Sequence, residues 1–213
     1  MPPGNARIVL KGIGVSPGIA IGKAYRVDRH RTSLVYYYLP SPAQTQNEKD
    51  RFNAAVDSAE ADLKKIRSQM AGEFPEHVYI LDSHIHILRD RMLYDETVRI
   101  IEEQGINAEW ALKQALENAQ HIFAKIEDEY IRSRISDVDY VAERVLQNLT
   151  GQNRQSVAGI KERVIVVAQD LSPADSIQLQ VEKTLAIVTD MGGKTSHTAI
   201  ITRSLGIPAV VGL

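Results

Sequence analysis

Residues 164–213 read VIVVAQDLSPADSIQLQVEKTLAIVTDMGGKTSHTAIITRSLGIPAVVGL, and the order of elements in this stretch decides the fold class. Val164 to Ala168 and Leu185 to Thr189 are short apolar runs, which predict two buried strands. Ser172-Pro173 is typical of a helix N-cap followed by a first-turn proline. The pattern therefore predicts strand, helix and strand in that order.

The rest of the stretch repeats this alternation. Asp190 to Lys194 reads as a loop that leads into a helix ending near Gly206, and Ala209 to Val211 reads as a further short strand. Strands that alternate with helices favour an α/β unit whose strands are at least partly parallel.

The first 40 residues contain strand and turn signals and belong to the same expected α/β unit. Pro40 and Pro42 close this region. Its segments are the strand-like Arg7 to Leu10, the glycine-rich Gly12 to Gly22, Ala24 to Val27, and the β-prone Leu34 to Leu39.

Between these parts the apolar residues recur every three or four positions, which predicts four amphipathic helices and hence a helical bundle. Asn107 is expected to cap the third helix and Gly151 to end the fourth. We therefore expect residues 1–40 and 151–213 to form a discontinuous α/β domain and residues 41–150 an inserted helical subdomain. The four stripes are Phe52, Val56, Ala59, Leu63, Ile66 and Met70; Leu81, Ile85, Leu88 and Met92, continuing towards Ile101; Leu112, Ala115, Ala119, Ile122, Ile126 and Tyr130; and Val138, Val141, Val145 and Leu149.

Composition limits the classes of function. With 44% hydrophobic and 24% charged residues the chain should fold as a globular protein, and a net charge of -2 provides no basic field for nucleic acid. The absence of cysteine excludes disulfides, thiolate zinc sites and a cysteine nucleophile. No run reaches the roughly 18 apolar residues that span a bilayer, and no signal peptide is evident. We expect a cytoplasmic protein without a membrane partner.

The segment Gly192-Gly193-Lys194-Thr195-Ser196-His197-Thr198 combines features that suit an anion. Paired glycines permit positive φ and close approach, and the first-turn amides and dipole of the following helix favour negative charge. A phosphate could be held there without a metal.

The same helix end disfavours imidazolium, so we expect His197 to be neutral and nucleophilic. Thr195, Ser196 and Thr198 are the nearest groups to neutralise a transferred phosphoryl group. An alternative is that Ser196 merely caps the helix and His197 is an exposed first-turn residue. Other phosphate signatures fail, because Val188 stands where a Walker loop needs glycine and Pro17 stands where a dinucleotide motif needs its third glycine.

Residues Gly192 to Gly212, reading GGKTSHTAIITRSLGIPAVVG, resemble the phosphohistidine signature of the phosphoenolpyruvate-utilising enzymes. GIGVSPGIAIGKAYRV, from Gly12 to Val27, resembles the opening of the enzyme I family of the bacterial sugar phosphotransferase system. DSHIHILRD and DEYIRSRISDV resemble the helical part of that family.

The resemblance implies an α/β phosphohistidine (swivelling) domain with an inserted four-helix subdomain that docks the phosphocarrier protein HPr. His197 would be phosphorylated by phosphoenolpyruvate, on the ring nitrogen remote from the backbone, and would pass the group to a histidine of HPr. Ser176 matches a family threonine that orients the imidazole. The expected contacts with HPr are His84, Leu88, Asp90 and Arg134.

The chain departs from the family in two respects. The family's HIMLLED-like helix reads HIHILRD here, so His86 and Arg89 change a surface expected to meet HPr. Family members also continue beyond Leu213 into a barrel that binds phosphoenolpyruvate, magnesium and a dimer partner. We therefore expect this chain to behave as a monomeric N-terminal fragment without a cofactor, which does not react with phosphoenolpyruvate alone but exchanges phosphate with phosphorylated HPr.

Two other functions stay open. One is the histidine domain of another phosphoenolpyruvate-utilising enzyme, although such relatives place a nucleotide-binding region before this domain. The other is a non-catalytic helical adaptor. No metal site is expected, because His84 and His86 are two residues apart on a helix and do not share a face.

Overall fold

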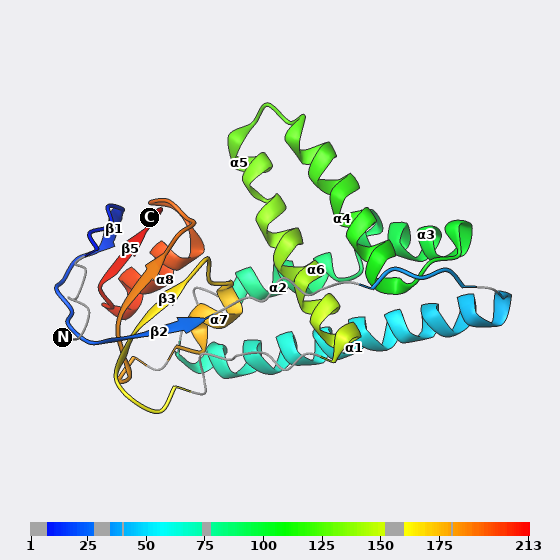
Figure 1. The fold of residues 1–213 in the computed structure, drawn as a ribbon. Helices are drawn as coiled ribbons and strands as arrows, with labels where there is room; N and C mark the ends of the chain where they lie inside the picture. Colours follow the sequence, from blue (N-terminus) through cyan, green and yellow to red (C-terminus); the bar gives the residue numbers. More distant parts are fainter. Residues whose placement is uncertain (1–7, 28–34, 40, 74–77, 152–159, 180) are drawn as a thin grey trace, which may run out of the picture. The chain divides into compact units, whose positions relative to one another are not determined.

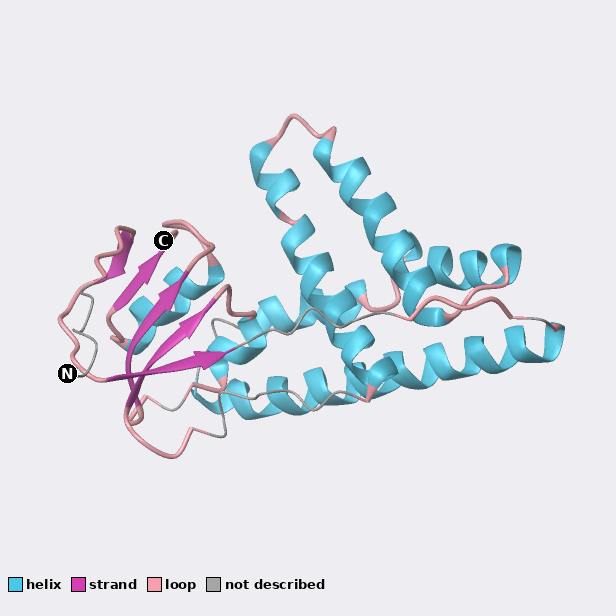
Figure 2. Cartoon of the chain, in the orientation of Figure 1, coloured by secondary structure: helices cyan, strands magenta, loops and turns pink. Residues whose placement is uncertain are grey.

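A computed structural model describes residues 8–27, 35–39, 41–73, 78–151, 160–179 and 181–213 (Figures 1 and 2). The chain divides into two units: Met1–His30 with Gln155–Leu213, and Arg31–Arg154. Arg7, Leu34 and Pro40, which belong to predicted strands and turns, lie outside the described residues.

The first unit contains a five-stranded sheet in the order β1-β5-β4-β3-β2. Strands β2, β3, β4 and β5 run parallel to their neighbours, and β1 pairs antiparallel with β5. The expectation of a partly parallel sheet is confirmed. The strands are β1 (Ile13–Ser16), β2 (Lys23–Val27), β3 (Val164–Ala168), β4 (Thr184–Thr189) and β5 (Ala209–Val211).

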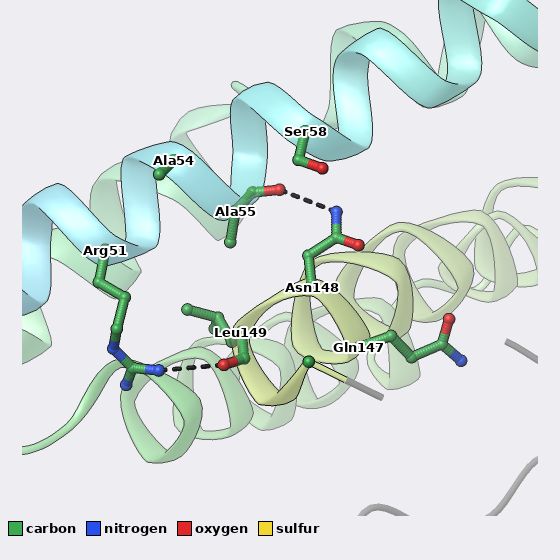
Figure 3. A pocket seen from close by; sticks show the side chains of 8 residues that line it. Arg51, Ala54, Ala55, Ser58, Gln147, Asn148 and Leu149 are labelled. Atoms are coloured by element: carbon green, nitrogen blue, oxygen red, sulfur yellow. Dashed lines mark hydrogen bonds between the residues drawn. The ribbon is translucent and has the colours of Figure 1, made fainter. Parts of the chain in front are cut away.

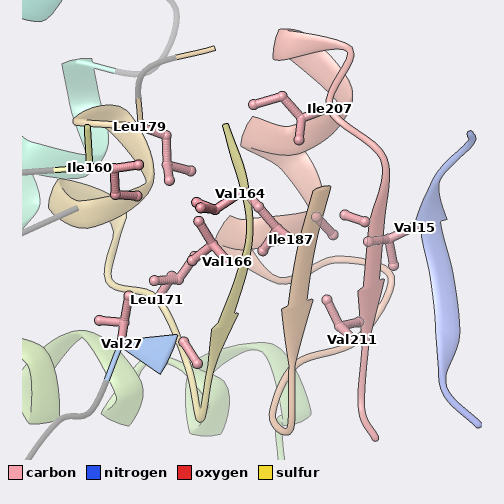
Figure 4. Close-up of a cluster of buried hydrophobic side chains, with 13 residues drawn as sticks. Val15, Val27, Ile160, Val164, Val166, Leu171, Leu179, Ile187, Ile207 and Val211 are labelled. Atoms are coloured by element: carbon pink, nitrogen blue, oxygen red, sulfur yellow. The ribbon is translucent and has the colours of Figure 1, made fainter. Parts of the chain in front are cut away.

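The core of this unit lies on one face of the sheet (Figure 4). Alternate residues of β3 are buried, as the two-residue period of a strand requires, and they join Ala199 and Ile207 in the buried cluster. Two helices follow β3 and β4 in the chain, α7 (Pro173–Ile177) and α8 (His197–Leu205), and they pack against each other. Ser172 caps α7 as predicted, in a capping box with Asp175.

Two strand predictions near the N-terminus were wrong. Ile8 to Leu10 form no strand, and β1 lies instead inside the glycine-rich stretch. Val35 to Leu39 form only one bridge, between Tyr38 and Ile106, and therefore belong to the helical unit. Their backbone groups form hydrogen bonds with residues 105–107, which directly precede helix α4 (Ala108–Ala124); Leu39 N, for example, donates to Gly105 O at 2.7 Å.

The second unit is helical. Helix α1 packs against α2 and α6, and α4 packs against α3 and α6, which buries much of the predicted apolar stripes. Ile122 and Tyr130 of the third stripe are instead 51% and 67% exposed. The helices are α1 (Pro42–Glu73), α2 (Val78–Ile87), the short π-helix η2 (Arg91–Asp95), α3 (Glu96–Gln104), α4 (Ala108–Ala124), α5 (Glu129–Ser133) and α6 (Ile135–Thr150). None of the helices in the described part of the chain is both long enough and apolar enough to cross a membrane.

Two of the four predicted helices are interrupted. The second breaks after Ile87, because the Asp90 carboxylate accepts a hydrogen bond from Met92 N at 2.9 Å and starts η2. The third ends at Ala124 and does not reach Tyr130, which lies in α5. Asp128 begins that short helix by accepting from Ile131 N.

Side chains of α1 and α6 bond across their contact, beside a pocket of about 390 Å³ (Figure 3). Asn148 Nδ2 donates to Ala55 O at 3.1 Å, and Arg51 Nη1 donates to Leu149 O at 3.2 Å. Gly151 ends α6 in the left-handed conformation at φ 64°, as predicted from the sequence.

Candidate functional site

The carboxyl ends of β3, β4 and β5 meet at one edge of the sheet. Ala168 pairs with Thr189, and Thr189 pairs with Val211. The loop that follows β4 is fixed to the loop after β3, because Met191 N donates to Gln169 O at 2.9 Å. Leu213 N donates back to Thr189 O at 3.4 Å. Ligands of open parallel sheets bind at this edge, so the loop of residues 190–196 occupies the expected place for a site.

The two glycines of the loop differ. Gly192 has φ 109°, and a methyl group on its Cα would lie 3.2 Å from Ser196 Oγ and 3.4 Å from Val211 Cβ. Gly193 does not have a positive φ, and a methyl group there would meet nothing within 4 Å. The predicted positive φ therefore applies to Gly192 alone, whereas Gly193 leaves open space on its side of the loop.

His197 is the first residue of α8 and is half-buried. Ser196 is the N-cap: its backbone is extended, its Oγ accepts from Ala199 N at 3.3 Å, and its own N–H donates to Gly193 O at 3.0 Å. The cap fixes the first turn, where helix amides and the dipole favour an anion. An imidazole thus stands where a phosphoryl group would be stabilised.

The three predicted hydroxyls lie in different surroundings. Thr195 is exposed beside the histidine, and the Ser196 hydroxyl is used as the cap. Thr198, which we expected to contact a phosphate, is buried at 2% exposure, and its Oγ1 has no hydrogen-bond partner among the described residues. Position 198 shares its helix face with Thr202, whose Oγ1 donates to Thr198 O at 2.7 Å.

Ser176 lies on α7, the helix that packs against α8. Its side chain is 0% exposed, and its Oγ has no hydrogen-bond partner within the described parts of the chain. The expected hydrogen bond to the imidazole is therefore not formed in this structure. A buried hydroxyl without a partner costs about 1–3 kcal/mol, and among the described residues the Thr184 and Thr198 hydroxyls are in the same state.

Arg203 is a site residue that the sequence argument did not place. Arg203 lies six residues after His197, about 240° round an ideal helix, so the sequence alone does not place it beside the imidazole. In the structure Arg203 Nη2 donates to Lys194 O at 3.1 Å, so the guanidinium reaches the loop that precedes His197. Long side chains lean back towards the N-terminus of their helix, but that lean alone does not specify a contact with a residue nine positions earlier.

The helical unit contains a pocket of about 600 Å³ between α2, η2, α4 and α6. Its lining is mainly apolar, and Asp90 and Arg134 are among its polar residues. Arg134 also donates to the Tyr130 hydroxyl and lies 3.4 Å from Asp137 Oδ2. The hydrogen bond to Tyr130, more than any other contact, raises the pKa of Arg134. The apolar members of the lining include Tyr79, Ile80, Ile87, Met92, Leu93, Phe123 and Val138.

His84 and Leu88, the other two expected partner contacts, are buried inside the helical unit. His84 is 3% exposed and its Nε2 lies 3.4 Å from Asp137 Oδ1. The structure therefore does not offer either side chain as an exposed contact. No group of three or more histidine or carboxylate side chains able to hold a metal ion occurs among the residues described.

His86 and Arg89, the two residues that differ from the family's HIMLLED-like segment, are exposed. His86 Nδ1 lies 2.6 Å from Asp82 O, and His86 also borders the pocket. Arg89 binds Asp57 at 2.5 Å and Glu60 at 3.2 Å, which attaches the end of α2 to α1. Arg89 therefore has a structural role in addition to changing the charge of this surface.

Fold and site together define a histidine-bearing α/β unit joined to a helical unit. The chain belongs to the family of phosphoenolpyruvate-utilising enzymes. Residues 11–134 match the family's N-terminal model (PEP-utilising enzyme, N-terminal), and residues 160–213 match its mobile-domain model (PEP-utilising enzyme, mobile domain).

Relatives and solved structures agree with this membership. The chain is 40% identical to the phosphoenolpyruvate-protein phosphotransferase of Cupriavidus necator over 96% of its length and 36% of the relative. It is 37% identical to the Bacillus subtilis protein of the same name, over 95% of this chain and 35% of the relative. The chain thus spans about a third of the length of these curated relatives.

Two solved structures resemble the fold. The NMR solution structure of an Enzyme I protein has a TM-score of 0.78 and 33% identity, over 96% of this chain and 83% of that one. The N-terminal domain of "Enzyme 1 - Nitrogen" has a TM-score of 0.62 and 28% identity, over 94% of this chain and 82% of that one.

Proposed function

We propose that this chain is the phosphohistidine-bearing part of a phosphoenolpyruvate-protein phosphotransferase, acting in the cytoplasm at the first step of sugar uptake. One observation carries the proposal: His197 begins a capped helix directly after a glycine loop at the carboxyl edge of the sheet. The names of the relatives support the same reaction class.

The reaction moves one phosphoryl group twice. In the first step the phosphorus–oxygen bond of phosphoenolpyruvate breaks as a lone pair of the neutral His197 imidazole forms a phosphorus–nitrogen bond. The enolate of pyruvate leaves and takes a proton from water. In the second step that phosphorus–nitrogen bond breaks while a new one forms on a histidine of HPr. The proton on the second ring nitrogen of His197 stays in place throughout.

The loop supplies the electrostatic part of the reaction. Phosphoryl transfer depends mostly on alignment and on neutralising the equatorial oxygens, for which the first-turn amides of α8 and the Thr195 hydroxyl are placed. The open space beside Gly193 leaves room for the molecule that donates or accepts the phosphoryl group to approach His197. In the proposal the Ser176 hydroxyl bonds the second imidazole nitrogen during transfer.

HPr is the proposed partner of the helical unit, and the 600 Å³ pocket is its proposed docking place. An apolar centre with charged residues at its border is the usual anatomy of a protein interface. Asp90 and Arg134 are the border residues proposed to pair with charges of HPr.

Reaction with phosphoenolpyruvate itself, its magnesium and the dimer contact are proposed to reside in parts of the relatives that this chain does not span. The chain by itself is proposed to be a monomer that equilibrates phosphate with HPr.

The deciding experiment incubates the chain and a His197→Ala variant with phosphorylated HPr and measures the intact mass of each. We expect one acid-labile phosphoryl group on the parent and none on the variant. A folded parent without phosphate would contradict the proposal and favour a helical adaptor. Phosphate supplied instead by a nucleotide would favour another member of the family.

The docking surface has its own test. Tyr79 is 58% exposed and lines the pocket, so Tyr79→Ser should weaken HPr binding about tenfold in a calorimetric titration. Tyr38→Ser is the matched control, because Tyr38 is exposed on the helical unit but does not line the pocket. Equal affinities of the two variants would remove the pocket from the interface.

A further inference from the structure

We propose that Arg203 is a positioning residue for phosphoryl transfer, which orients the Lys194–Thr195 peptide beside His197. The inference rests on the proposed function and deepens it by adding a residue at the other end of α8. Arg203 lies in the last turn of the helix, yet its Nη2 bonds Lys194 O at 3.1 Å, in the loop before the helix.

The hydrogen bond from Arg203 to Lys194 O also fixes the direction of the next amide, because the peptide unit is planar. The carbonyl and the following N–H of a trans peptide point in opposite directions. When Arg203 holds the Lys194 carbonyl, the Thr195 N–H points away from the guanidinium. Arg203 therefore selects the direction of an amide that lies two residues before His197 in the proposed phosphate loop.

The neighbouring carbonyls of the loop are held as well. Thr189 Oγ1 donates to Met191 O at 2.7 Å, and Ser196 N donates to Gly193 O at 3.0 Å. The donors come from β4, from the N-cap and, with Arg203, from the end of α8. Of these three donors Arg203 is the only charged one, and its bond to Lys194 O is exposed, so the planar geometry of the guanidinium carries the argument more than the strength of the bond.

An arginine in the last turn of a helix also has a simpler explanation, since a cation there interacts favourably with the helix dipole. That role needs only the charge and does not require contact with residue 194. The observed bond to the N-terminal loop is what favours positioning, and the two roles predict different results for a lysine substitution.

The test compares Arg203→Gln with the control Arg163→Gln, which removes an exposed arginine of the same unit before β3. Phosphorylation of His197 by phosphorylated HPr is timed by intact mass, and the backbone amide resonances are recorded by NMR. We expect Arg203→Gln to slow phosphorylation about 10- to 100-fold, as displacement of positioned groups does, and to shift the Thr195 amide resonance. The control should change neither.

Arg203→Lys separates a loss of positioning from a loss of stability, because lysine keeps the charge that favours the helix dipole but lacks the planar guanidinium group. A lysine variant as stable as the parent, with a shifted Thr195 amide and slower transfer, would support positioning. Parental rates and amide shifts in both Arg203 variants would overturn it. If the parent itself accepts no phosphate, the proposed function fails, and the Thr195 resonance still decides whether Arg203 orients the loop.

Discussion

Arg51 on α1 donates hydrogen bonds to both carboxylate oxygens of Glu109 on α4, at 2.7 Å from Nη1 to Oε1 and 2.6 Å from Nη2 to Oε2. The same guanidinium bonds Glu48 at 2.7 Å and the Leu149 carbonyl of α6 at 3.2 Å. Burial raises the pKa of Glu109, but the hydrogen bonds from Arg51 and Asn107 outweigh burial and leave this pKa below its usual value. The network joins three helices of the second unit.

Glu109→Gln should lower the free energy of unfolding by about 1–3 kcal/mol, because Arg51 would lose its bidentate partner. The pKa of Glu109 is lowered in the folded state, so its contribution is present above the unfolded value of about 4.3 and is lost as the pH falls through the folded value. Urea unfolding at pH 7 and in acid measures both effects. Glu103→Gln, which breaks an exposed pair with Arg99, is the control and should change stability less. Equal losses would contradict a special role of the Arg51 network.

The charged carboxylate of Asp139 on α6 should lower the stability of the fold, whereas that of Glu109 raises it. Burial raises the pKa of Asp139 despite a hydrogen bond from Gln120, so the charged carboxylate destabilises the fold at neutral pH. Asp139→Asn keeps an acceptor for Gln120 and should stabilise the protein by up to about 1 kcal/mol at pH 7. The gain should disappear as the pH falls through the raised pKa, where aspartate is itself protonated. Asp62→Asn, an exposed position of α1, should produce no such pH-dependent gain.

Much of the fold follows from spacing in the sequence, and its failures have physical reasons. The apolar period continues through Leu81, Ile85 and Leu88, so it does not reveal that Asp90 stops one helix and caps the next. The same period contains a signal that was overlooked. His84 lies three residues after Leu81 and four before Leu88, which places it on the buried face of the helix.

At the site, the sequence predicts the loop, the N-cap and the histidine at the start of a helix, because each depends on local residue types. It does not predict contacts that depend on how elements pack. The burial of Thr198 follows from how α8 packs against its neighbouring elements, and the Arg203 bond follows from the path of the loop beside the helix. Neither is encoded in the spacing of the motif.

Gly192→Ala should destabilise the α/β unit by about 1–3 kcal/mol, because an alanine would have to adopt φ near 109° with its methyl against Ser196 Oγ. Thermal unfolding of the two alanine variants measures the difference, since Gly193→Ala should unfold like the parent. Phosphorylation by phosphorylated HPr should nevertheless be slower in Gly193→Ala, because the methyl would occupy the open side of the loop. A Gly193→Ala protein that accepts phosphate at the parental rate would show that the group approaches from elsewhere.

Ser176→Ala separates a functional hydroxyl from a structural one. The Ser176 Oγ is buried and has no hydrogen-bond partner in the described parts of the chain, so its removal should leave the thermal midpoint unchanged or higher. If the hydroxyl orients the imidazole during transfer, the exchange of phosphate between His197 and HPr should fall about tenfold, which corresponds to roughly 1.4 kcal/mol in the barrier. Ser172→Ala on the same helix provides the contrast. It loses the capping box with Asp175 and should reduce stability by about 1 kcal/mol. Parental exchange in Ser176→Ala would exclude the orienting role, because nothing else in the surroundings of that hydroxyl would change.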